Sequence, residues 1–153
     1  MTKRILFAGL LGLLFCFPAF SQTEEEQVEA VIKSLFEGMR AKDVDQVTAA
    51  FSKDALMQTV IAKPEGSEVA SNAVADFISR IASTPVETQL DERILAYQIK
   101  IDGTMASAWT PYQFYTNGTF SHCGVNSFQL VKMAEGWKIV YIIDTRRKEP
   151  CER

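Results

Sequence analysis

The stretch Phe120–Asn126, FSHCGVN, places the chain's only histidine, His122, next to Cys123. A histidine titrates near neutral pH, so it can transfer a proton, bind a metal ion or hydrogen-bond a ligand. The sequence disfavours a metal site, because it has no second histidine and no cysteine cluster. It also disfavours a Cys–His nucleophilic pair, since adjacent strand residues point to opposite faces. Two roles stay open: a hydrogen-bonded wall residue of a pocket, which we favour, and a general acid or base.

The Asn117-Gly118 dipeptide is a strong signal for a two-residue turn between two strands. A hairpin closed by that turn sets Gln113 opposite His122. Period-two alternation then predicts one mixed aromatic and polar face, made of Trp109, Gln113, Tyr115, His122, Asn126 and Phe128. The opposite face is predicted to hold Tyr112, Phe114, Cys123 and Val125. A face of the first kind is typical of small-molecule sites.

The last predicted hairpin leaves two registers open. A three-residue turn at 134–136 pairs Asn126 with Asp144 and places Asp144 and Arg146 on the face of His122. A two-residue turn shifts the register by one residue and sends both to the other face. We favour the first register, in which Arg146 can hold an anion; a solvated strand end is the alternative.

Helical periodicity marks the first half of the chain and strand periodicity the second half. Thr23 and Glu26 form a capping box for a helix over 24–41, and Asp43 can cap a second helix over 44–51. A strand over 55–62 and a third helix over 68–81 are expected next. Four strands separated by tight turns follow, at 92–101, 104–115, 120–131 and 137–144. Helices ahead of an antiparallel sheet predict an α+β domain.

Residues 1–21 have the pattern of a secretory signal peptide. Two basic residues precede an apolar run, Ile5–Phe17, that is too short to span a bilayer comfortably. Small residues follow, so cleavage is expected between Ser21 and Gln22. A retained anchor is the alternative, disfavoured by the proline and small residues that end the run. We therefore expect a single domain, 22–153, in the periplasm or secreted, with no membrane partner after cleavage.

The charge and the cysteines of the mature domain exclude one partner class and suggest one bond. Without Lys3 and Arg4, the 16 basic residues fall to 14 against 19 acidic ones, so the domain is acidic and a poor candidate for binding nucleic acid. Cys123 and Cys151 remain of the three cysteines. In an oxidising compartment, this even pair favours a disulfide that ties the C-terminal tail to the sheet. Two thiols too far apart to bridge are the alternative.

The order of these elements, together with the segment AWTPYQFYTNGTFSHCGVNSFQLVKMAEGWKIVYIIDTRR, resembles the nuclear transport factor 2-like superfamily. Within it, the chain is most similar to the exported bacterial lumazine-binding-like branch, on the evidence of Trp109–Arg147. The resemblance implies a cone-shaped fold, with three N-terminal helices packed on a strongly curved antiparallel sheet. It also implies a homodimer through the outer face of the sheet and a small molecule in the cone. This superfamily contains both binders and enzymes, so the fold alone does not decide the function.

We expect an exported small-ligand-binding or accessory protein whose ligand is aromatic or heterocyclic, with no cofactor implied. Trp109 and Phe128 would form apolar walls, and polar side chains would orient the ligand: Gln113, His122, Asn126, Asp144 and Arg146. The alternative is an isomerase, dehydratase or cyclase in which His122 transfers a proton and Asp144 fixes its tautomer. That catalytic set lacks a second acid or base. A dimeric interaction module with a filled cone is a third possibility.

Overall fold

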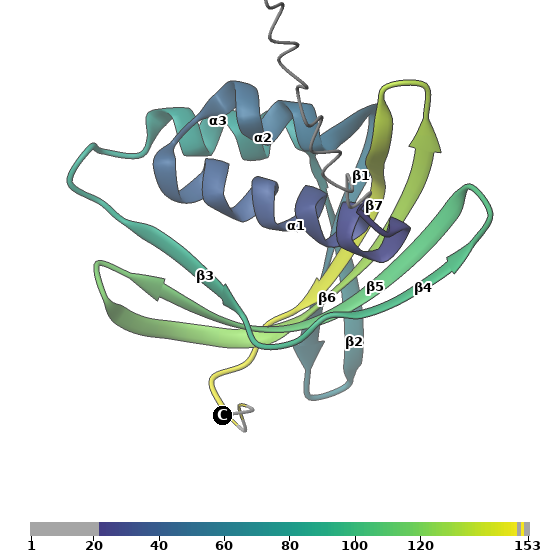
Figure 1. Cartoon of the computed structure of the whole chain (residues 1–153). Helices are drawn as coiled ribbons and strands as arrows, with labels where there is room; N and C mark the ends of the chain where they lie inside the picture. Colours follow the sequence, from purple (N-terminus) through teal and green to yellow (C-terminus); the bar gives the residue numbers. More distant parts are fainter. Residues whose placement is uncertain (1–21, 150, 152–153) are drawn as a thin grey trace, which may run out of the picture.

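Three helices lie in the hollow of one strongly curved sheet in the computed structural model of the chain (Figure 1). The structure describes residues 22–149 and 151, so the expected signal peptide lies outside the described residues. Within that part, no helix is long and apolar enough to cross a membrane. The α+β class and the curved sheet predicted from the sequence are confirmed.

The first two helices begin where their capping residues predict. Helix α1 (Glu24–Ala41) starts with a capping box: Thr23 accepts from the backbone N–H of Glu26, and Glu26 accepts from that of Thr23. Helix α2 (Val44–Ala50) is capped by the side chain of Asp43. Both predictions are confirmed to within one residue. The apolar stripe of α1 is buried at Val28, Ile32, Leu35, Phe36 and Met39.

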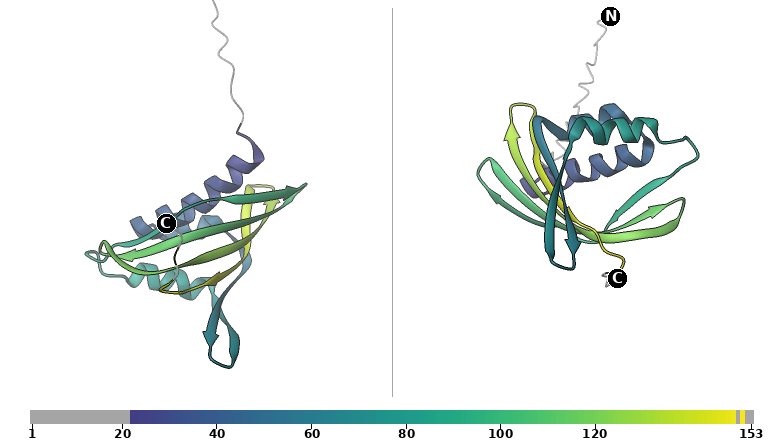
Figure 2. Two further views of the ribbon diagram at one scale, coloured as in Figure 1. Left: turned by 90° about the horizontal axis from the view of Figure 1, so that it is seen from below. Right: turned by 180° about the vertical axis from the view of Figure 1, so that it is seen from behind.

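The predicted start of the third helix was wrong. Residues 66–73 form strand β2 (Gly66–Ala73), which pairs antiparallel with strand β1 (Phe51–Lys63), and helix α3 (Val74–Ser83) starts only afterwards. The short segment GSEVASNA has no strong helical preference, so pairing with β1 decides its conformation. The β1–β2 hairpin extends well beyond the rest of the domain (Figure 2, left).

The described sheet has seven strands in the order β2-β1-β7-β6-β5-β3, and β4 pairs with the other half of β5. The bounds not yet given are β3 (Leu90–Ile94), β4 (Gln98–Asp102), β5 (Met105–Thr116), β6 (Thr119–Met133) and β7 (Gly136–Thr145). All pairs are antiparallel except β1 with β7, which are parallel. The sheet is therefore a curved, unclosed surface with its antiparallel meander at the C-terminal end.

The single strand expected over 92–101 is two strands, β3 and β4. The break faces Pro111 of β5, which has no backbone N–H to donate and only accepts a hydrogen bond, from the N–H of Leu95. One extra residue lies on the β3–β4 side, since Ile94 pairs with Tyr112 but Gln98 pairs with Trp109. This irregularity lets β3 leave the line of β4 and follow the curved end of β5.

The hydrophobic core lies between the helices and the concave face of the sheet. Phe36 of α1 meets Phe128 of β6 edge to face, with ring centroids 6.3 Å apart. The most deeply buried apolar side chains come from both layers: Val28, Ile32, Leu35, Val47, Ile81, Phe128, Leu130 and Ile139. Part of this core, including Leu35, Ile81 and Phe128, also lines the candidate site.

Candidate functional site

One residue of β6, Ser121, determines which side chains of β5 lie on the same face of the sheet as His122. From the Asn117-Gly118 turn, Thr116 pairs with Thr119 and Tyr115 with Phe120, as predicted. The next pair is Phe114 with His122, so the ladder skips Ser121 in a β-bulge. The register therefore shifts by one residue for the rest of the hairpin.

The prediction for the β5 side of the site was wrong for this reason. Gln113 pairs with Cys123 instead of His122, and Trp109 pairs with Ser127. Neither of these β5 residues lines the cavity described below, and Trp109 is 49% exposed on the convex face. Tyr112 and Phe114, which were expected on that face, line the cavity in their place.

The β6–β7 register was predicted correctly at the cavity, from Asn126 to Gln129, but the predicted turn and the register next to it were wrong. The turn has two residues, since Met133 pairs with Gly136, but a bulge between Ile139 and Tyr141 then shifts the register by one. Asn126 therefore pairs with Asp144, as favoured from the sequence. Asp144 and Arg146 both line the cavity with His122.

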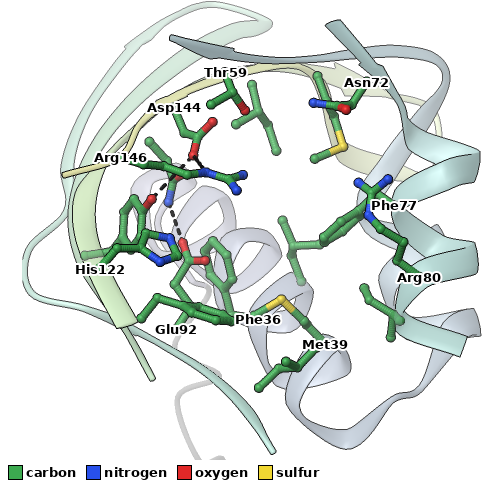
Figure 3. A pocket seen from close by; sticks show the side chains of 18 of the residues that line it. Phe36, Met39, Thr59, Asn72, Phe77, Arg80, Glu92, His122, Asp144 and Arg146 are labelled. Atoms are coloured by element: carbon green, nitrogen blue, oxygen red, sulfur yellow. Dashed lines mark hydrogen bonds and ion pairs between the residues drawn. The ribbon is translucent and has the colours of Figure 1, made fainter. Parts of the chain in front are cut away.

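The cavity has a volume of about 310 Å³ and lies between the concave face of the sheet, α1 and α3 (Figure 3). Its apolar wall comes mainly from aromatic and long aliphatic side chains: Leu35, Phe36, Met39, Phe77, Phe114 and Phe128. This volume is within the range of small-molecule sites, and apolar walls are their usual lining.

A buried polar network forms the β5–β7 side of the cavity. The amide nitrogen Nδ2 of Asn126 donates to Oε1 of Glu92 at 2.7 Å. The hydroxyl of Tyr112 lies 3.4 Å from Oδ2 of Asp144 and 3.1 Å from the backbone oxygen of Thr145. Oδ2 of Asp144 also accepts from Nε of Arg146 at 2.7 Å. These contacts hold the polar side chains in fixed positions against an apolar background.

Glu92 is a cavity residue that the sequence analysis missed. Burial raises the pKa of its carboxyl from 4.5 to about 7; the hydrogen bond from Asn126 opposes this shift, the charge of Asp144 adds to it, and that of Arg146 opposes it. The sequence does contain a pattern that could have revealed Glu92. It alternates with Leu90 and Ile94 along one strand, so its acidic side chain interrupts an apolar face. At neutral pH this carboxyl is present in both its neutral and its ionised form.

His122 packs between two aromatic side chains of β5. Its ring lies 5.0 Å from that of Phe114 and 5.8 Å from that of Tyr112, measured between centroids. Burial, with a smaller contribution from Arg146, lowers the pKa of His122 below 6.5, while Asp144 opposes the shift. The imidazole is therefore mainly neutral at pH 7. Its Nδ1 lies 3.0 Å from the hydroxyl oxygen of Ser121, the bulge residue.

Gly124 allows the polar network to close. A Cβ atom at this position would lie 1.8 Å from the backbone oxygen of Thr145 and 2.9 Å from the ring of Tyr112. Only a residue without a side chain therefore lets β6, β7 and the Tyr112 ring approach this closely. The same approach brings the Tyr112 hydroxyl to Thr145 and Asp144.

The opposite side of the cavity carries a second, looser set of polar groups. Asn72 of β2 and Arg80 of α3 line it across the cavity from His122 and Glu92 (Figure 3), while Thr59 of β1 lies beside Asp144, with which it pairs. Among the described residues, no group of three or more His, Cys, Asp or Glu side chains could hold a metal ion. The walls of the cavity thus present hydrogen-bonding, charged and apolar side chains.

A disulfide joins Cys123 to Cys151 on the other face of β6, with the Cα atoms 5.9 Å apart. The backbone of Cys123 also pairs with Arg147, donating and accepting one hydrogen bond each. The C-terminal segment is thus held against β6 one residue from His122, as the sequence analysis expected.

The match to a family model and the solved structures agree with this architecture. Residues 23–142 match the model of the family described as "Putative lumazine-binding". No curated protein matches the chain. A nuclear transport factor 2-like protein of unknown function from Shewanella baltica is 19% identical, with a TM-score of 0.61 over 82% of this chain and 95% of its own.

Two further solved structures have the same fold. A nuclear transport factor 2-like superfamily protein from Salmonella enterica serovar Typhimurium is 17% identical, with a TM-score of 0.63 over 82% of this chain and 92% of its own. A protein from Streptomyces avermitilis, described as a "putative dehydratase" of the nuclear transport factor 2-like family, is 13% identical. Its TM-score is 0.62 over 81% of this chain and 96% of its own. At these identities the likeness establishes the fold alone. The chain belongs to the family described as "Putative lumazine-binding", and it has the fold of the nuclear transport factor 2-like proteins.

Proposed function

We propose that the protein is an exported binding or accessory protein that holds a small aromatic or heterocyclic molecule in its cavity. The main support is the division of the cavity of about 310 Å³ into an aromatic wall and a fixed polar side. A flat ring can pack on Phe36, Phe114 and Phe128 while its polar atoms meet the opposite side chains. The name of the family supports a heterocycle. Export rests on the signal pattern of residues 1–21.

The polar side offers both hydrogen-bond donors and acceptors to such a ring. His122, Asn126, Asp144 and Arg146 were proposed as ligand contacts from the sequence, and all four line the cavity. Glu92 joins them. Because Asn126 and Asp144 are buried and already hydrogen-bonded, their positions are set before a ligand arrives, which lowers the ordering cost of binding.

Native mass spectrometry of protein purified from its own host tests this proposal, with retention of a small molecule as the expected result. Thr59→Trp, which would fill the cavity from β1, should abolish retention. Val60→Trp is the matched control, because the neighbouring residue does not line the cavity. No retained molecule, together with no binding of lumazine or related aromatic compounds, would overturn the proposal.

A second candidate is an enzyme of the isomerase, dehydratase or cyclase type. The observation that favours it is Glu92, whose pKa of about 7 suits a general base at neutral pH. Together with His122 and Asp144, it would supply the second proton-transfer group that the sequence analysis lacked. The "putative dehydratase" among the structural relatives is compatible with this candidate. If the wild type converts a retained molecule and the Glu92→Gln variant does not, the protein is an enzyme of this type.

A further inference from the structure

The charges around the cavity are unevenly compensated. Asp144 is buried and forms an ion pair with Arg146, so this acid and this base neutralise each other. Arg80 is a second cation on the opposite side of the cavity. The remaining acid is Glu92, whose pKa is raised by burial to about 7, so that its neutral form is accessible near neutral pH. With Glu92 protonated, the cavity lining carries a net positive charge of one.

The Arg146 side chain is arranged to offer part of its guanidinium to a ligand. Its Nε is used by Asp144 at 2.7 Å. The terminal nitrogens project from the sheet toward the middle of the cavity (Figure 3), and the side chain is 57% exposed. Anchoring Arg146 through Nε fixes the plane of the fork, and a fixed guanidinium can bind a carboxylate with two parallel hydrogen bonds.

We propose that the ligand is a small organic acid, whose ring packs on the aromatic wall and whose carboxylate binds the terminal nitrogens of Arg146. This inference rests on the proposed binding function and assigns the chemical class of its ligand. Arg80, at the far side, adds a longer-range attraction for the anion. A carboxylate restores neutrality when Glu92 is protonated, whereas a cationic ligand would meet two arginines.

Binding of a carboxylate should be coupled to the protonation of Glu92. The polar and titratable groups that share this cavity wall with Glu92 are Tyr112 of β5, His122 and Asn126 of β6, Asp144 of β7 and Arg146 just after β7. From α1 the cavity receives only apolar side chains, and Arg40 of that helix is engaged with Asp91. An added anion beside these groups disfavours the ionised form of Glu92, so binding takes up a proton. Affinity should then fall as the pH rises through about 7.

A matched pair of probes tests the charge of the ligand directly. Naphthalene-2-carboxylate and naphthalene-2-carboxamide have the same ring and nearly the same shape, and pterin-6-carboxylate with pterin provides a second, heterocyclic pair. Isothermal titration calorimetry on the full mature chain should find each carboxylate bound at least about tenfold more tightly than its neutral partner. The preference should weaken between pH 6 and 8.5 in the wild type and stay constant in Glu92→Gln.

Variants identify the cation responsible. Arg146→Gln should remove the preference for the carboxylate, so that the charged and the neutral probe bind with similar affinity. This single change leaves the carboxylate of Asp144 buried without its partner. The double variant Asp144→Asn/Arg146→Gln removes both charges, and it should likewise bind the charged and the neutral probe with similar affinity. Arg147→Gln is the matched control, because the adjacent arginine does not line the cavity.

Failure of this inference can be told apart from failure of the proposed function. Equal affinity for the charged and neutral probes, or a preference that survives in the double variant, overturns the organic-acid assignment while the cavity remains a binding site. If neither member of either pair binds, but the native protein retains a neutral molecule, the assignment also fails and the binding function stands. If no small molecule of either kind binds, both fail.

Discussion

The side-chain amide of Asn126 donates a 2.7 Å hydrogen bond to Glu92, joining two strands, β6 and β3, that are separated by β5. The two residues are 34 positions apart in the chain. Their contact crosses the concave face of the sheet and brings a carboxyl group with a raised pKa to the wall of the cavity. Burial raises this pKa, and the hydrogen bond from Asn126 opposes the rise.

The free energy of unfolding of Glu92→Gln, taken relative to that of the wild type, should increase as the pH rises. The folded-state pKa of about 7 lies above the ordinary value of 4.5, so the folded protein holds this proton more tightly than the unfolded chain. The resulting stabilisation of the wild type is complete below about pH 4.5 and is lost as the pH rises through 7. The gain of the variant between pH 4.5 and 8 should reach at most about 3 kcal/mol. Urea unfolding of both proteins across this range measures it, with Glu135→Gln as a surface control; a pH-independent difference would contradict the assignment.

Gly124→Ala should destabilise the fold strongly. Its Cβ would overlap the backbone oxygen of Thr145 and press on the Tyr112 ring, and the Thr145 backbone can give way only if the end of β7 moves away from β6. We expect a loss of more than about 3 kcal/mol in thermal or urea unfolding. Gly103→Ala is the comparison: its positive φ of 58° is strained but nothing lies within 4 Å, so about 1 kcal/mol is expected. Equal costs at the two sites would refute the packing argument.

His122 should act in recognition through its hydrogen bond and its ring, with its charge playing no part. Its pKa is lowered below 6.5 by burial and then by Arg146, so the neutral form dominates at pH 7. His122→Gln should keep binding of the retained molecule within about threefold, whereas His122→Ala should weaken it by about tenfold. Binding titrations of the two variants measure this. Loss of a wild-type turnover in His122→Gln would instead favour the enzyme candidate.

The Cys123–Cys151 disulfide should form when the protein is produced in an oxidising compartment, and it should stabilise the fold. It closes a loop of 28 residues, which corresponds to roughly 3 kcal/mol in the chain-entropy model. Peptide mapping of non-reduced protein should recover the two cysteines in one linked peptide, and reduction should lower the stability of the wild type to that of Cys151→Ser. Two fully alkylatable thiols would remove the claim.

Dimerisation through the outer face of the sheet stays a prediction from the superfamily resemblance. On the convex side of strand β5, Trp109 is 49% exposed and Met105 is 53% exposed, which gives this face apolar surface for a second copy. Light scattering at tens of micromolar should find a dimer in the wild type and a monomer in Trp109→Glu. Val86→Glu, in the loop before β3, is the control and should remain dimeric. A wild-type monomer at that concentration would count against the prediction.

The sequence by itself determined the elements whose signals are local. Thr23 with Glu26 and Asp43 mark the starts of two helices, because a cap needs only residues three positions apart. Asn117 with Gly118 marks the β5–β6 turn, because both residues adopt positive φ there. The α+β class and the family resemblance follow from the order of such elements, and both are confirmed.

Only the tertiary structure decided which side chains share the cavity. A strand alternates with a period of two, so the single extra residue Ser121 exchanges Trp109 and Gln113 for Tyr112 and Phe114 on the inner face. Glu92 reaches the site through a strand two places away from β6 in the sheet, a contact that no local pattern specifies. Bulges and pairing between distant strands are chosen by the packing of the whole sheet against the helices, and that packing is a property of the folded chain.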